Sequence, residues 1–103
     1  MAHGVPDNWR EIENGVIHLI RLLDGRLPKR DLELAETLAR AGEWGIALEN
    51  LVTQLYEYDV AISPDVLEEI SRLGIAMNLN DESWDILRVE GRPSSSAPDS
   101  PPR

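Results

Sequence analysis

Apolar residues recur every three or four positions along four successive segments of this chain, and glycine, proline or polar turn residues separate the segments. Such spacing gives an α-helix one apolar stripe. No run of β-branched residues alternates with polar residues at a period of two, so strands are not expected. The sequence therefore predicts an all-α fold, a small single-domain bundle of four helices.

The first helix is predicted from Asp7 to Asp24, with Asp7 or Asn8 as its N-cap and Gly25 at its end. Gly15 lies inside this segment and lowers its helix propensity. Because glycine has no side chain, we expect a neighbouring helix to come close at this position. The apolar stripe consists of Trp9, Ile12, Val16, Leu19, Ile20 and Leu23.

The second and third helices are expected to form a tight hairpin, because Gly42 alone separates them. The second begins near Pro28, and its predicted inner face is Leu34, Ala35, Leu38 and Ala41. The third runs from about Glu43 to Tyr58, and its predicted stripe is Trp44, Ala47, Leu48, Leu51, Val52 and Leu55.

Ser63-Pro64-Asp65 is the clearest helix start in the chain, with a capping hydroxyl, a proline and then an acid. The fourth helix should end near Asn78, and its inner face is Val66, Ile70, Leu73 and Met77. Residues 84–89 then form either one or two helical turns or an extended strap. We expect residues 1–90 to make one domain and the Pro/Ser-rich residues 91–103 to be a disordered tail.

The sequence shows no set of residues in a pattern that is typical of an enzyme active site. The chain has no cysteine, no HExxH sequence and no glycine-rich phosphate loop. His3 and His18 have no partner at a metal-ligand spacing, and His18 is interpreted as a partly exposed helix residue. Adjacent acids such as Glu57/Asp59 and Glu68/Glu69 are interpreted as solvated side chains. We therefore expect no catalytic residue, no cofactor and no metal.

The lack of cysteine favours the cytoplasm, because small secreted domains often depend on disulfides. The N-terminus has no signal-peptide pattern, and no apolar stretch approaches ~20 residues, so no membrane span is expected. The basic residues Arg26, Lys29 and Arg30 have no aromatic residues among them. They are interpreted as decorating helix ends, and no nucleic-acid partner is expected.

Negative charge is concentrated in the second half of the chain. The formal net charge is −9, from 19 acids and 10 bases. Residues 1–42 hold seven acids and six bases, whereas residues 43–90 hold eleven acids and only Arg72 and Arg88. This distribution disfavours nucleic acid and anionic membrane and favours a basic partner. A simple solubilising role for the acids fits equally well.

Two tyrosines and two acids close the third helix, and acids of the fourth helix follow. Tyrosines contribute strongly to many binding sites, and acids beside them give charge complementarity. Helical phase places Tyr58 near the core stripe and Tyr56 to one side of it. The fourth helix carries its acids on the face opposite Val66 and Ile70. The predicted partner-binding residues are Tyr56, Glu57, Tyr58, Asp59, Asp65, Glu68 and Glu69.

The run from Ala41 to Leu51 (AGEWGIALENL), continued by Gln54 to Asp59, resembles the small MafI-family immunity proteins of bacterial polymorphic toxin systems. The proline-started helix at Ser63-Pro64-Asp65 and the stretch from Leu79 to Leu87 are also similar. The likeness extends over about residues 7–88. It implies a cytoplasmic protein that binds and neutralises a cognate toxin, here through an acidic surface that meets a basic one.

The alternative is a small helical adaptor or regulatory subunit unrelated to toxins. Self-association through Trp44 or Trp84 would favour that alternative. A small enzyme is the third hypothesis, and the sequence supports it least.

Overall fold

The computed structural model of the protein describes residues 8–91. Four helices of 12 to 14 residues come first: α1 (Trp9–Leu22), α2 (Lys29–Arg40), α3 (Trp44–Glu57) and α4 (Pro64–Ala76). A four-residue helix, α5 (Glu82–Asp85), and two short strands, β1 (Ala61–Ile62) and β2 (Arg88–Val89), complete the fold. The predicted all-α bundle with a short fifth turn is confirmed, and residues 84–89 are part helix and part extended.

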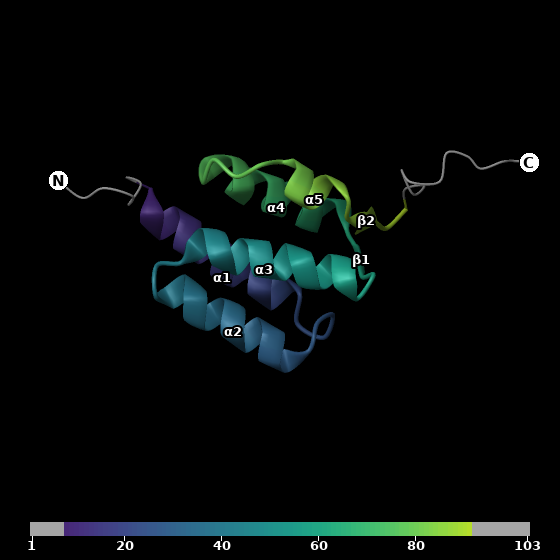
Figure 1. Cartoon of the computed structure of the whole chain (residues 1–103), viewed down its shortest axis with the longest axis horizontal. Helices are drawn as coiled ribbons and strands as arrows, with labels where there is room; N and C mark the ends of the chain where they lie inside the picture. The colour runs from purple at the N-terminus through teal and green to yellow at the C-terminus, as the bar shows by residue number, and fades with distance from the viewer. Residues whose placement is uncertain (1–7, 92–103) are drawn as a thin grey trace, which may run out of the picture.

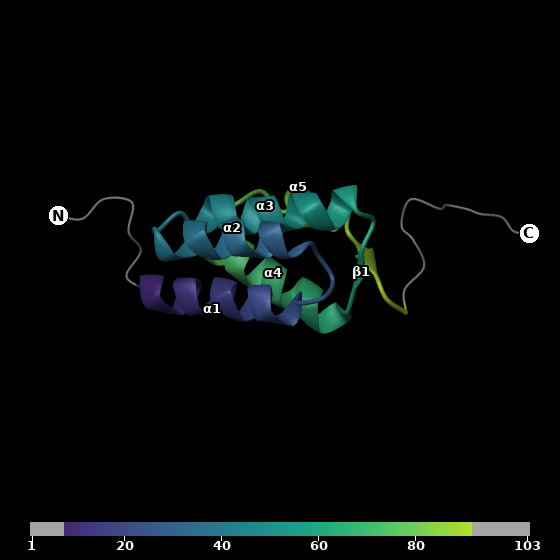
Figure 2. The same cartoon turned by 90° about the horizontal axis from the view of Figure 1, so that it is seen from below.

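The four long helices run alternately in opposite directions (Figure 1), with α1 in contact with α2, α3 and α4. Seen from below, α3 and α5 lie on one side of the bundle and α1 on the other (Figure 2). The chain returns from α4 through α5 to place β2 beside β1. The strands pair in parallel, Ala61 with Arg88 and Ile62 with Val89. This pairing was not predicted, since strands of two residues are too short to leave an alternating pattern.

The core is apolar throughout, and no polar or charged residue is buried among residues 8–91. All six residues of the predicted α3 stripe are buried, and so are Val66, Ile70 and Leu73 of α4. Ser63 caps α4 as expected: its hydroxyl accepts a hydrogen bond from the Val66 amide at 3.1 Å. Asn8 precedes α1 without a side-chain capping bond, and the other proposed cap, Asp7, lies outside the described residues, as does the predicted tail beyond Gly91.

The inner face of α2 was predicted wrongly in part. Leu32, Ala35 and Ala39 are buried, whereas Leu34 is 51% exposed and Ala41 is also exposed. Leucines stand at both 32 and 34, and residues two apart on a helix point about 200° apart, so only one of the two can face the core. The observed face presents two alanines, which lets neighbouring helices approach closely.

Helices α2, α3 and α4 end in the same left-handed turn, with Gly42, Asp59 and Asn78 at positive φ. In each case the amide of the next residue donates a hydrogen bond to the carbonyl five residues earlier, as from Val60 to Leu55 at 2.9 Å. This turn explains why Tyr58 is 46% exposed, although helical phase places it near the core stripe. Tyr58 is the C-cap of α3, and the chain turns away from the helix at Asp59, so no further helical turn covers this side chain.

Gly15 of α1 lies where α4 crosses, as its sequence position suggested. A Cβ atom at Gly15 would lie 2.6 Å from Leu73 Cδ2, inside van der Waals contact. At the ends of α1 and α3, Trp9 and Trp44 stack with ring centroids 6.1 Å apart. The Trp44 indole also donates a hydrogen bond to Glu13 at 3.2 Å. These contacts fix α1 against α3 and α4.

A second glycine, Gly74 of α4, provides the seat of Trp84. The indole of Trp84 is only 4% exposed, and a Cβ atom at Gly74 would lie 2.3 Å from its Cζ3 atom. The ring therefore rests directly on the backbone of α4. Leu87 and Val89 are buried after it. These three side chains anchor the C-terminal segment, residues 82–89, to the helices.

Gly74→Ala should lower the free energy of unfolding by about 1–3 kcal/mol, because the new methyl group displaces a buried ring. Gly45→Ala is the matched control, since its Cβ would meet only Leu79 Cδ2 at 3.8 Å. That variant should gain up to about 1 kcal/mol of helix propensity. Urea unfolding followed by circular dichroism measures both. A Gly74→Ala protein as stable as Gly45→Ala would contradict this account of Trp84.

Candidate functional site

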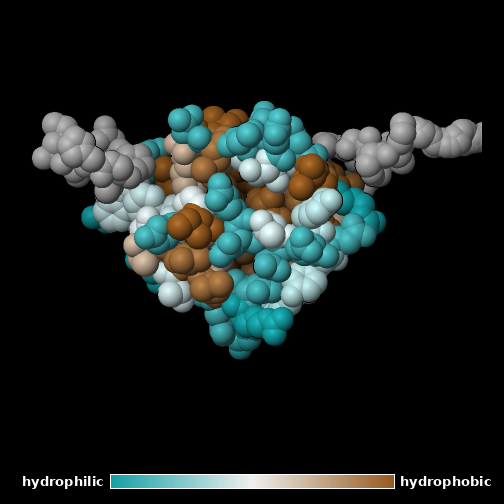
Figure 3. All heavy atoms as spheres, viewed as in Figure 1, coloured by the Kyte–Doolittle hydropathy of each residue, from teal (hydrophilic) through white to brown (hydrophobic). Residues whose placement is uncertain are grey.

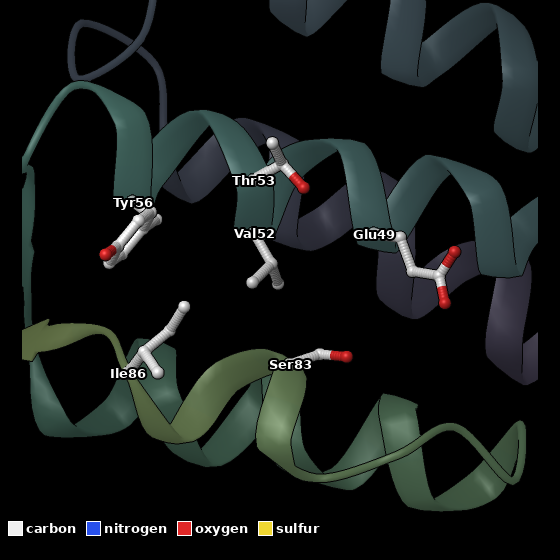
Figure 4. Close-up of a pocket in the computed structure, with 6 residues that line it drawn as sticks. All are labelled: Glu49, Val52, Thr53, Tyr56, Ser83 and Ile86. Atoms are coloured by element: carbon white, nitrogen blue, oxygen red, sulfur yellow. The ribbon is translucent and has the colours of Figure 1, made fainter.

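A groove lies between α3 and α5 (Figure 4). Four of its residues come from α3 at helical spacing, and two come from α5 and the residue after it. The groove has a volume of about 310 Å³ and is lined by Glu49, Val52, Thr53, Tyr56, Ser83 and Ile86. This volume is at the small end of the range for ligand sites, roughly 300–1,000 Å³, and suits a side chain better than a cofactor.

The two ends of the groove differ in chemistry. Figure 4 shows Tyr56 and Ile86 facing each other at one end, with Glu49 and Ser83 at the other and Val52 between them. Tyr56 and Ile86 are each 55% exposed. Apolar surface is visible among polar side chains on this side of the molecule (Figure 3). The groove thus offers apolar contact at one end and a carboxylate with hydroxyl groups at the other.

Eight acids between residues 43 and 91 form no ion pair within the described part of the chain. All eight are exposed: Glu43, Glu49, Glu57, Asp65, Glu68, Asp81, Glu82 and Asp85. Four of them belong to α3 or α5, the two helices that form the groove. This surface therefore carries a negative potential that internal cations do not neutralise.

The two basic residues between positions 43 and 90, Arg72 and Arg88, each form an ion pair with an acid from the same range. Arg72 pairs with Glu69 at 2.6 Å, and this hydrogen bond raises the pKa of Arg72 above its ordinary value. Arg88 binds both carboxylate oxygens and the carbonyl of Asp59. Arg26, from the α1–α2 connection, pairs with Glu90 at 3.5 Å and donates to the Ala61 carbonyl. The Arg88–Asp59 pair connects β2 to the end of α3, and the Arg26–Glu90 pair connects the residue after β2 to the α1–α2 connection.

The predicted partner-binding residues do not share one environment. Tyr56 lines the groove, and Glu57, Tyr58, Asp65 and Glu68 are exposed. Two others already serve the fold. Asp59 is bound by Arg88, and the carboxylate of Glu69 faces α1, 3.4 Å from where a Gly15 Cβ would lie.

The sequence-based prediction missed five residues of the groove, Glu49, Val52, Thr53, Ser83 and Ile86. Glu49, Thr53 and Tyr56 do recur at spacings of four and three, which marks one side of α3. Nothing in that spacing shows that α5 lies beside it. The burial of Trp84 positions α5 there, and that contact leaves no periodic signal.

Within residues 8–91, no cluster of three or more His, Asp or Glu is placed to hold a metal ion. His18 is exposed on α1. No helix in this range is both long and apolar enough for a membrane span.

Comparison of the chain with protein-family models, with curated proteins and with solved structures finds no match. Inference about its function therefore rests on the residues themselves.

Asp59 adopts a left-handed conformation, with φ of 56°. Asp59→Ala should lower the free energy of unfolding by about 1–2 kcal/mol, because alanine is strained there and loses the bond to Arg88. Asp59→Gly also loses the ion pair but adopts this φ freely, so it should stay within about 0.5 kcal/mol of the parent. Urea unfolding distinguishes the two. If both variants were as stable as the parent, Asp59 would have no structural role.

Proposed function

We propose that this protein binds and neutralises a cognate bacterial toxin by stoichiometric association, as the resemblance to MafI-family immunity proteins implies. In this proposal it acts in the cytoplasm of the cell that makes the toxin. The face formed by α3 and α5 meets a basic surface of the toxin and either covers its active site or holds an inactive form.

The observation that carries the proposal is the exposed acidity of the α3–α5 face beside Tyr56 and Ile86, whose carboxylates form no ion pair within residues 8–91. Unpaired carboxylates attract a basic protein and speed its association. Exposed aromatic and aliphatic side chains at the centre of such a face supply contact area that excludes water. Acidity for solubility alone does not account for a groove with apolar walls inside the acidic surface.

One argument for the alternative, a helical adaptor or regulatory subunit, is weakened. Self-association through Trp44 or Trp84 would favour it, but both side chains are buried against Trp9 and Gly74. Association through the exposed groove would serve either function. The choice between them depends on what the partner does.

The test is co-expression with the polypeptide encoded next to this gene. That polypeptide should be toxic when expressed alone and harmless when this chain is present, and the two should form an equimolar complex. Raising the salt concentration from about 0.05 to 0.5 M should weaken the complex, because salt screens exposed charges. A harmless neighbour, or a toxic one that does not bind this chain, would refute the proposal.

Glu82→Gln/Asp85→Asn should weaken the complex about tenfold, mainly through slower association, and should flatten its salt dependence. Asp24→Asn/Glu33→Gln is the control. It also removes two exposed carboxylates that form no ion pair in the described part of the chain, but these lie on α2 and in the connection before it. Surface plasmon resonance gives both rate constants. Equal losses in the two variants would mean that only total charge matters and that the α3–α5 face is not the interface.

A further inference from the structure

We infer that the α3–α5 groove receives one arginine side chain of the partner. This inference rests on the proposed function, because it places the groove inside the partner interface. It adds the chemical identity of the group that is recognised. An arginine has an apolar stem and a planar cationic head, and the groove presents a matching surface to each.

The apolar end of the groove fits the stem. Val52 lies between the two ends, and Tyr56 and Ile86 face each other at the end beside it. Long cationic side chains bury their methylene groups along apolar surface and keep the charged head at a polar position. Contact with the stem would cover part of the exposed surface of Tyr56 and Ile86.

The other end fits the guanidinium. Glu49 provides a carboxylate, and Ser83 across the groove provides a hydroxyl oxygen that accepts a hydrogen bond. A guanidinium has five N–H donors in one plane and can bond to several acceptors at once, whereas an ammonium is a point charge. Two acceptors on opposite walls therefore favour arginine over lysine.

The surrounding charge favours a cation as well. Glu82 and Asp85 flank Ser83 in the sequence of α5, and both are exposed without an ion-pair partner in residues 8–91. The nearest base along the chain, Arg88, is bound to Asp59. No described arginine or lysine forms an ion pair with Glu49, so this carboxylate is available to a cation from outside.

The probe is the blocked tripeptide acetyl-Gly-Arg-Gly-amide, titrated into the ¹⁵N-labelled full chain and followed by NMR. The amide signals of Thr53, Tyr56, Ser83 and Ile86 should shift together and saturate. The lysine tripeptide should bind about two- to fivefold more weakly. The citrulline tripeptide has the same shape without the charge, and it should bind at least fivefold more weakly.

Three pairs of variants distinguish binding in the groove from nonspecific attraction of the peptide to the acidic surface. Glu49→Gln, Tyr56→Ala and Ile86→Ser alter the groove, and each should weaken the arginine tripeptide about two- to fivefold, as loss of an exposed ion pair or apolar contact does. The matched controls are Glu33→Gln, Tyr58→Ala and Ile75→Ser, which change exposed residues of the same type outside the groove. The controls should bind like the parent. Circular dichroism establishes that all six are folded.

Equal binding of the citrulline tripeptide would overturn the inference, and so would shifts spread over all exposed acids. Groove signals that change with protein concentration before any peptide is added would assign the groove to a second copy of the chain, which also overturns it. The tripeptide experiment needs no toxin. Arginine binding without a toxic neighbour would refute the proposed function alone, and a toxin complex unaffected by Glu49→Gln and Tyr56→Ala would refute this inference alone.

Discussion

The contact between Trp84 and Gly74 determines the form of the second half of this protein. A helix of four residues such as α5 has no stability of its own, because a single turn fixes more backbone than its hydrogen bonds repay. The indole seated on α4 supplies the missing stability, and Leu87 and Val89 extend it. Because residue 74 is a glycine, Trp84 packs directly on α4, and α5 lies close enough to α3 for the two helices to form a groove.

Some charged residues of this protein form ion pairs that hold the fold together, and others face solvent. Arg88 and Arg26 bind Asp59, Glu90 and the Ala61 carbonyl, so they secure the short strands at one end of the bundle. These pairs are exposed, and each adds little to stability. With Arg88 bound to Asp59, no described basic residue forms an ion pair with the acids of α3 or α5. The resulting repulsion among carboxylates opposes folding slightly, and the basic partner of the proposed function would relieve it.

Much of the fold could be predicted because its signals are local. The stripe of α3, the Ser63-Pro64 start of α4 and the Gly42 turn each depend on residues a few positions apart. The predictions were wrong or incomplete where tertiary contacts determine which residues are buried. Leu32 and Leu34 fit the helical period equally well, and only packing selects Leu32. The groove needed the docking of Trp84 and the pairing of β1 with β2, so the sequence identified Tyr56 but not Ser83 or Ile86 across from it.

Within α5 and the turn after it, anchoring residues alternate with exposed ones. Trp84 and Leu87 are buried, whereas Glu82, Asp85 and Ile86 face solvent. Exposed positions tolerate substitution at little cost in stability, so this wall of the groove can change its chemistry while the bundle stays the same. Related chains could diverge rapidly here and acquire new partners through very few mutations. Under the proposed function, adapting this protein to a different toxin would require substitutions in this short segment and not a new fold.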